Sequence, residues 1–197
     1  KKKLKKISNI LKSKKNQKVI IENCDISKVK EIDNLFNKIT KKVKKIDILI
    51  NNAGIYGPKG KFEDLPWKDI EETFNINLFG SIYLIKCIIP HFKKFNKGKI
   101  IQLSGGGAAS PLPFFSAYAT SKAGVVRFVE NLSEELISYK IDINAIAPGP
   151  VNTGMLEEVL KENPKKVGKS FYNKSLAQKK SGGTDIKKIL NCIEFLS

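Results

Sequence analysis

The sequence contains little cysteine and almost no histidine. Its three cysteines, Cys24, Cys87 and Cys192, are far apart, and His91 is the only histidine. Widely spaced cysteines are typical of reduced thiols rather than of a disulfide framework or a metal site. A single histidine argues against the common zinc sites and against Ser-His-Asp or Cys-His catalysis. We therefore expect no metal centre.

Long apolar runs are also missing. No stretch reaches the roughly eighteen apolar residues that a membrane span requires. The Lys-rich first residues are not followed by the apolar stretch and cleavage site of a signal peptide. We therefore expect a cytoplasmic protein without a membrane partner.

Arginine is nearly absent, although the chain is strongly basic. The 36 basic and 19 acidic residues give a formal charge of +17, but Arg127 is the only arginine and the lysines are spread along the chain. Nucleic-acid sites cluster their positive charge and favour arginine for bidentate contacts. We therefore expect no nucleic-acid partner.

The apolar pattern predicts a single α/β domain over residues 1–197. Helical and strand-like segments alternate, as in a parallel sheet covered by helices. The expected strands are 18–24, 46–50, 99–103 and 141–146, and the expected helices are 1–14, 28–44, 66–92, 116–139 and 185–196, with 154–183 irregular or partly helical. The strands from 46–50 onward are apolar runs, so we expect them to be buried on both faces.

The expected fold is a doubly wound, Rossmann-like parallel sheet in three α/β/α layers. Ligands of such sheets bind beyond the carboxyl ends of the strands. Polar, glycine-rich or proline-rich residues follow the strands at Asp25, 51–54, 104–107 and 148–153. This coincidence predicts a ligand site at that edge of the sheet.

Tyr118 and Lys122 are candidates for proton transfer. They are four residues apart on a predicted helix, so they share one face. An ammonium group beside a phenol lowers the pKa of the tyrosine, which can then exchange a proton with a substrate oxygen. Tyrosine and lysine at this spacing also occur by chance in a Lys-rich chain, and the tyrosine is then an ordinary exposed residue.

Six motifs of the sequence, taken in order, resemble those of the short-chain dehydrogenase/reductase family. The resemblance is to the single-domain kind similar to 3-oxoacyl-acyl-carrier-protein reductases. The matching motifs are Asp25, the NNAG of Asn51–Gly54, the NINL of Asn75–Leu78, a serine at a strand end, Y-x-x-x-K at 118–122 and the PGPVNT of Pro148–Thr153. The resemblance implies a Rossmann fold. It also implies hydride transfer between NAD or NADP and a small-molecule carbonyl or secondary alcohol.

The resemblance implies four catalytic residues. Tyr118 is the general acid in reduction and the base in oxidation, and Lys122 binds the nicotinamide ribose and lowers the pKa of Tyr118. Ser104 holds the substrate oxygen. Asn77 interrupts its helix and holds a water in a proton relay, with Asn75 as the alternative for this position.

A larger set is implied to bind the cofactor. Asp25 receives the adenine amino group, or it is only a helix cap. Val151 and Thr153 contact the carboxamide. The full implied set is Asp25, Asn52, Ala53, Gly54, Tyr118, Lys122, Pro148, Gly149, Val151 and Thr153, of which 52–54 also stabilise the central sheet.

The sequence departs from the family in two places. Most relatives place the serine at the position of Gly105, so Ser104 must reach the substrate through a longer turn. The glycine-rich G-x-x-x-G-x-G turn, which holds the pyrophosphate at a helix N-terminus, is absent. We therefore expect a chain that is truncated at both ends and lacks the first strands and the last strand of the sheet.

Two further expectations follow from the resemblance. The protein is a homo-oligomer, a dimer or a tetramer, joined through helices 66–92 and 116–139, and residues 152–180 form a variable flap over the substrate. Phe114 and Phe115 either line the pocket or pack their loop. The alternative function is that of a non-catalytic, Rossmann-like binding or regulatory protein that has kept the motifs.

Overall fold

The computed structural model describes residues 18–197, so the helix expected over 1–14 lies outside the described residues. Its sheet has three parallel strands in the order β1 (Ile48–Asn51), β2 (Gly98–Leu103) and β3 (Ile141–Ile146). Each strand pairs in register with the next along its whole length. The three carboxyl ends therefore meet at one edge, as the sequence predicts.

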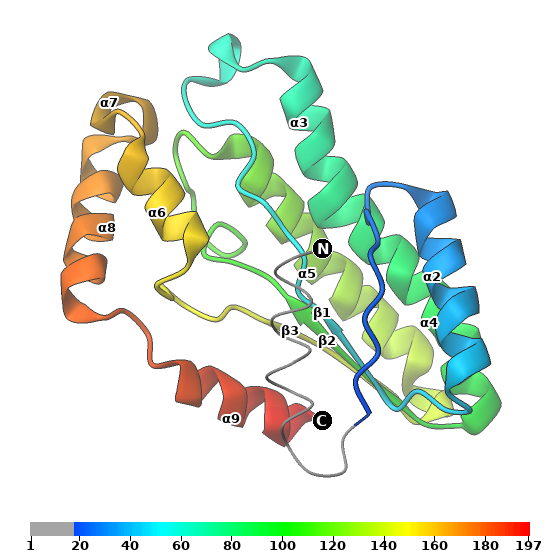
Figure 1. Cartoon of the computed structure of the whole chain (residues 1–197). Helices are drawn as coiled ribbons and strands as arrows, with labels where there is room; N and C mark the ends of the chain where they lie inside the picture. The colour runs from blue at the N-terminus through cyan, green and yellow to red at the C-terminus, as the bar shows by residue number, and fades with distance from the viewer. Residues whose placement is uncertain (1–17) are drawn as a thin grey trace.

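Helices cover the sheet on both sides (Figure 1). The helices α2 (Val29–Lys42), α4 (Ser81–Phe95) and α5 (Ser116–Leu136) lie together on one face. The last helix, α9 (Ile186–Leu196), contacts β2 from the other side and begins at Asp185, whose carboxylate caps it. This arrangement confirms the expected α/β/α architecture for the described part of the chain.

The main core lies between β2, β3 and the helices α4 and α5. Branched side chains of the strands alternate, so one set faces these helices and the other faces away. The buried members on the helix side are Ile85, Ile88, Phe92, Ile100, Val129, Leu132, Leu136, Ile141 and Ile143. This core fixes the height of α5 above the sheet, and α5 carries the candidate catalytic pair.

The strand expected over 18–24 does not form. Residues 18–25 run as irregular chain beside α2 in Figure 1, without a strand ladder. A β-branched run such as Val19–Ile21 becomes a strand only when a neighbouring strand accepts its backbone hydrogen bonds. Within the described residues β1 pairs only with β2, and no ladder joins residues 18–24 to a strand.

The strand β1 is less buried than the sequence predicts. Ile48 and Ile50 are 40% and 49% exposed, whereas the intervening Leu49 packs against the main core. The two isoleucines share one face of an edge strand, and no described element covers that face. The expectation of burial on both faces is therefore wrong for β1, although β2 is buried almost throughout.

The helix expected over 66–92 is a compound element. It consists of α3 (Trp67–Phe74), a π-helical turn η2 (Asn75–Gly80) and α4, and it continues past Pro90 to Phe95. By length and composition alone it could span a membrane, which the sequence reading did not pick out. In the structure its α4 part supplies Ile85, Ile88 and Phe92 to the core, as expected of a helix packed in a folded domain.

The segment after β3 is more ordered than expected. It contains α6 (Gly154–Lys161), α7 (Pro164–Val167) and α8 (Lys169–Ser181), which pack against each other. Thr153 caps α6, and Asn163 caps α7 with Pro164 at its first position, which favours a helix start. Two short 3-10 turns, η1 (Phe62–Asp64) and η3 (Ile137–Tyr139), complete the described elements.

Candidate active site

Tyr118 and Lys122 are both buried on the inner face of α5. Tyr118 is 7% exposed and Lys122 is 4% exposed. The Lys122 ammonium group donates a hydrogen bond of 3.0 Å to the backbone carbonyl of Leu103, the last residue of β2. The helix face that the spacing predicts therefore exists, and it points at the carboxyl end of the central strand. The reading of Tyr118 as an ordinary exposed residue is wrong.

Burial controls the protonation of this pair. It raises the pKa of Tyr118 to about 12, with the neighbouring Tyr56 as a smaller cause, and it lowers the pKa of Lys122 to about 8. The sequence predicts that Lys122 lowers the pKa of Tyr118, and this prediction is wrong, because the pKa of Tyr118 is raised. The reason is geometric, because the Lys122 ammonium group is directed to the Leu103 carbonyl, and loss of solvation dominates.

Gly105 is in direct contact with the tyrosine. A Cβ atom at this position would lie 2.1 Å from the Tyr118 hydroxyl oxygen, so no side chain fits there without moving the phenol. The adjacent Ser104 is buried, and its hydroxyl has no hydrogen-bond partner within the described structure. A buried hydroxyl without a partner is costly unless a ligand satisfies it, which supports the predicted role of Ser104.

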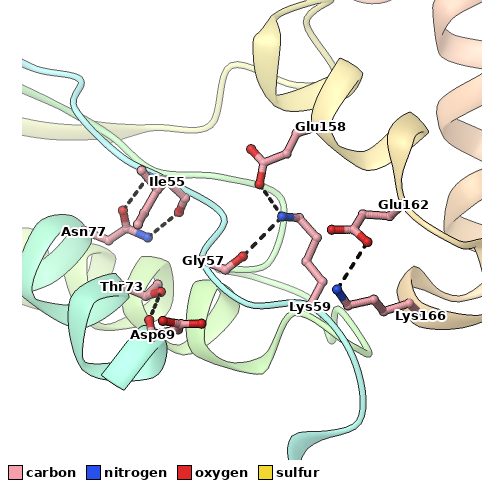
Figure 2. A network of polar contacts seen from close by, with 9 residues as sticks. All are labelled: Ile55, Gly57, Lys59, Asp69, Thr73, Asn77, Glu158, Glu162 and Lys166. Atoms are coloured by element: carbon pink, nitrogen blue, oxygen red, sulfur yellow. Dashed lines mark hydrogen bonds and ion pairs between the residues drawn. The ribbon is translucent and has the colours of Figure 1, made fainter. Parts of the chain in front are cut away.

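Asn77 ties the helix 67–95 to the loop after β1. It is fully buried in the π-helical turn η2, a type of turn that often occurs at functional sites. Its side-chain amide exchanges two hydrogen bonds of 2.8 Å with the backbone of Ile55 and donates a third, of 3.1 Å, to Ser121 (Figure 2 shows the Ile55 bonds). Asn75 is exposed, so the alternative assignment is excluded.

The predicted residues of the NNAG motif divide into two groups. Asn51 is buried and donates to the Ser81 carbonyl, so this asparagine, rather than Asn52, holds the sheet to α4. Asn52 and Ala53 are exposed where β1 ends. Gly54 is packed between site groups, because a Cβ there would lie 3.2 Å from both Asn77 Oδ1 and Lys122 Nζ.

Asp25 lies outside this cluster of buried groups. Its carboxylate accepts hydrogen bonds from the backbone and hydroxyl of Ser27 and pairs with Lys28 at 3.3 Å. The bonds from Ser27 lower the pKa of Asp25. The helix α2 starts after Lys28 without a side-chain cap, so Asp25 orders the preceding turn and does not cap α2 directly.

The other predicted cofactor residues follow β3. Gly149 adopts a positive φ of 75°, which a glycine tolerates, and the chain turns sharply after Pro148. Val151 forms an isolated antiparallel bridge with Gly183. The hydroxyl of Thr153 accepts a hydrogen bond from the backbone of Met155. A cavity of 610 Å³ lies beside this exit, between Pro150 and the α8 residues Phe171 and Ser175.

An aromatic cluster next to Tyr118 was only partly foreseen. The Tyr56 ring lies edge-on to Tyr118 at 4.8 Å and to Phe115 at 5.2 Å, and Phe115 contacts Phe171 at 4.9 Å. Phe115 is fully buried, whereas Phe114 is only partly buried and has a positive φ of 69°. The sequence reading missed Tyr56, whose only signal is that it comes two residues after the NNAG motif.

Comparisons with known proteins establish the family. The sequence profile of the family described as short chain dehydrogenase matches residues 1–164. The chain belongs to this family. It is 40% identical to 11-beta-hydroxysteroid dehydrogenase-like 3 from Arabidopsis thaliana over 138 residues, which are 70% of this chain and 44% of the relative. L-2,3-butanediol dehydrogenase from Corynebacterium glutamicum is 31% identical over 169 residues, 82% of this chain and 65% of that protein.

Solved structures share the fold. A levodione reductase aligns with a TM-score of 0.76 and 28% identity, covering 84% of this chain and 66% of its own. ElxO with NADP bound aligns with a TM-score of 0.73 and 26% identity, covering 80% and 64%. The Rossmann-like fold is therefore confirmed. The chain spans about half the length of the first curated relatives that it matches, 44% and 53% in two of them.

The contact between Gly105 and Tyr118 can be tested by a double-mutant cycle. We expect Gly105→Ala to lower the free energy of unfolding by about 1–3 kcal/mol, because the methyl group overlaps the phenol oxygen. In a Tyr118→Phe background the same change costs less, because the overlapping oxygen is gone. Gly106→Ala is the control, since a Cβ there meets nothing within 4 Å. Equal costs for Gly105→Ala in both backgrounds, measured by urea unfolding, would refute the contact.

The lowered pKa of Lys122 predicts a pH-dependent stability. Lysine in the unfolded chain keeps its ordinary pKa of 10.5, whereas the folded protein releases this proton near pH 8. Between these values the unfolded state binds more protons, so stability rises with pH, by up to about 1.4 kcal/mol per pH unit. Urea unfolding at pH 7.5 and 9.5 should show this gain in the native sequence relative to Lys122→Met. Parallel pH profiles for the two proteins would contradict the assignment.

Proposed function

We propose that the protein is an NAD- or NADP-dependent oxidoreductase that interconverts a carbonyl and a secondary alcohol. The observation that carries this proposal is the burial of Tyr118 and Lys122 on one face of α5, directly beyond the end of β2. The unpartnered hydroxyl of Ser104 lies on the same strand end and adds a second group suited to a substrate oxygen. Family membership supports the same reaction class.

The residues present fit the nicotinamide end of such a cofactor, which supplies or accepts the hydride when bound. The Lys122 ammonium group donates one hydrogen bond to the Leu103 carbonyl and has two further N–H donors for the ribose hydroxyls. Val151 and Thr153 flank the exit from β3, where they suit the carboxamide. Asn52, Ala53 and Gly54 line the neighbouring strand end, and Asp25 suits the adenine amino group. The glycine-rich turn for the pyrophosphate is not among these 197 residues.

In this mechanism Tyr118 moves the proton. With a pKa of about 12 the phenol is protonated at neutral pH, which is the form that donates to a carbonyl oxygen during reduction. Alcohol oxidation needs the phenolate instead. This form becomes accessible only if the Lys122 ammonium group turns from the Leu103 carbonyl toward the phenol. Asn77, which already bonds Ser121 on α5, fixes the loop that faces this pair.

The substrate class follows from the aromatic cluster. Tyr56, Phe115 and Phe171 pack around Tyr118, and aromatic walls favour apolar substrates. The names of two relatives, a hydroxysteroid dehydrogenase-like protein and a butanediol dehydrogenase, concern alcohols of different size. We therefore infer a small apolar ketone or alcohol as the substrate, with no nucleic acid involved.

The oligomeric state and the cellular location are also proposals. Trp67, Phe79, Ile137 and Tyr139 are exposed on or beside the helices 67–95 and 116–139. Large exposed apolar side chains on neighbouring helices suit an interface between copies of the chain. We propose a homodimer or homotetramer that works in the cytoplasm.

Replacing Tyr118 by phenylalanine tests the function. In the protein, Tyr118→Phe should lower ketone reduction by at least about 100-fold, because the acid is lost. Binding of NADH or NADPH, followed by fluorescence, should stay within a few-fold, because the ring is retained. Thr120→Val, on an exposed position of the same helix, is the control. A native protein that binds nicotinamide but reduces no ketone would support the non-catalytic alternative.

A further inference from the structure

The residues 152–182 form a flap with a closed base. The chain leaves the sheet after Val151 and returns at Gly183, and these two residues are joined by an antiparallel bridge. The Thr184 N–H donates to the Pro150 carbonyl at 2.8 Å. Gly182 and Gly183 have positive φ values of 89° and 69°, which only glycine adopts readily. The two ends of the flap are therefore joined at its base.

The inner side of the flap lies on the catalytic tyrosine. Val159 and Val167 are fully buried in one cluster with Phe115 and Tyr118, and the Phe171 ring of α8 contacts the Phe115 ring at a tilt of 60°. In this position the flap helps to bury Tyr118, which is 7% exposed. The loop after β1 packs on the same cluster through Tyr56, so the contacts between this loop and the flap hold both segments against Tyr118.

One ion pair joins the loop after β1 to the flap. Lys59, in the loop after β1, is 4% exposed, and its ammonium group pairs with Glu158 on α6 and bonds the Gly57 carbonyl at 3.2 Å (Figure 2). The same ammonium group lies 5.7 Å from the Tyr56 ring centroid. Lys59 thus joins the flap to the loop that also holds Tyr56 against Tyr118.

The other ion pairs of the flap stay within it. Among the described residues 18–197, Lys179 pairs with Glu157 at 3.0 Å and Lys166 with Glu162 at 3.3 Å, and both pairs join two parts of the flap. Exposed pairs of this kind contribute little. Lys59 differs because it is buried, and opening of the flap would leave its charge without a counter-charge until water reaches it.

We propose that Lys59 and Glu158 are positioning residues that hold the flap closed over Tyr118. The pair fixes α6 against the loop 55–60, which keeps Tyr56 and Phe171 on either side of the substrate. The loop 55–60 and the flap then close together over Tyr118. The proposal deepens the proposed function, on which its kinetic part rests, whereas its structural part is independent of turnover.

Limited proteolysis tests the structural part. In the protein, Glu158→Gln should increase tryptic cleavage between residues 154 and 181, at the flap lysines, by at least about threefold. Glu157→Gln is the matched control, since it makes the same change on the neighbouring residue and breaks only a pair within the flap. Glu158→Asp, which keeps the charge, should restore most of the protection. Equal cleavage of the Glu158→Gln and Glu157→Gln variants would overturn the proposal, whether or not the protein is active.

Steady-state kinetics tests the positioning role. Glu158→Gln should raise KM for the carbonyl substrate several-fold, because the flap closes on the substrate less often, while kcat changes less and NADH or NADPH binding is unchanged. An equal loss of kcat and kcat/KM would instead assign the pair to the chemical step and refute the positioning role. A native protein without turnover would refute the proposed function, and the proteolysis result would still decide whether the ion pair holds the flap.

Discussion

The bonds between the Asn77 amide and the backbone of Ile55 hold the catalytic region together. They join a π-helical turn, the loop after β1 and, through Ser121, the helix α5. A buried amide that satisfies both backbone groups of one residue fixes that residue strongly, because any shift leaves polar atoms unpaired in the interior. Gly54 beside it allows Asn77 and Lys122 to approach the same stretch of backbone.

The energetic balance at the site differs from a simple pairing of tyrosine with lysine. Both groups are buried, and the absence of solvation disfavours the charged form of each, so the phenol holds its proton and the ammonium group releases its proton more readily. This state suits proton donation to a carbonyl oxygen. In the proposed mechanism, alcohol oxidation requires the lysine to change its partner, which makes the Leu103 carbonyl a competitor for the same cation.

The proposed closure of the flap links proton transfer at Tyr118 to the access of substrate. Its apolar underside packs on Phe115 and Tyr118, and a single buried lysine ties it to the loop that Asn77 holds. In the proposed function, substrate access and proton transfer both depend on the same short loop, 55–60. A change in that loop would affect both processes, because Tyr56 contacts Tyr118 and Lys59 pairs with Glu158 of the flap.

The sequence by itself determined the α/β class, the strands β2 and β3, the helices that cover the sheet and the shared helix face of Tyr118 and Lys122, because periodicity and spacing are local properties. The choice of Asn77 followed from the family resemblance of its motif. Only the tertiary structure decided that 18–24 is not a strand, since a strand needs a partner. It also decided the direction of the Tyr118 pKa and the contact of Gly105 with the phenol. Burial and close approach arise from residues that are distant in the chain, so no local pattern encodes them.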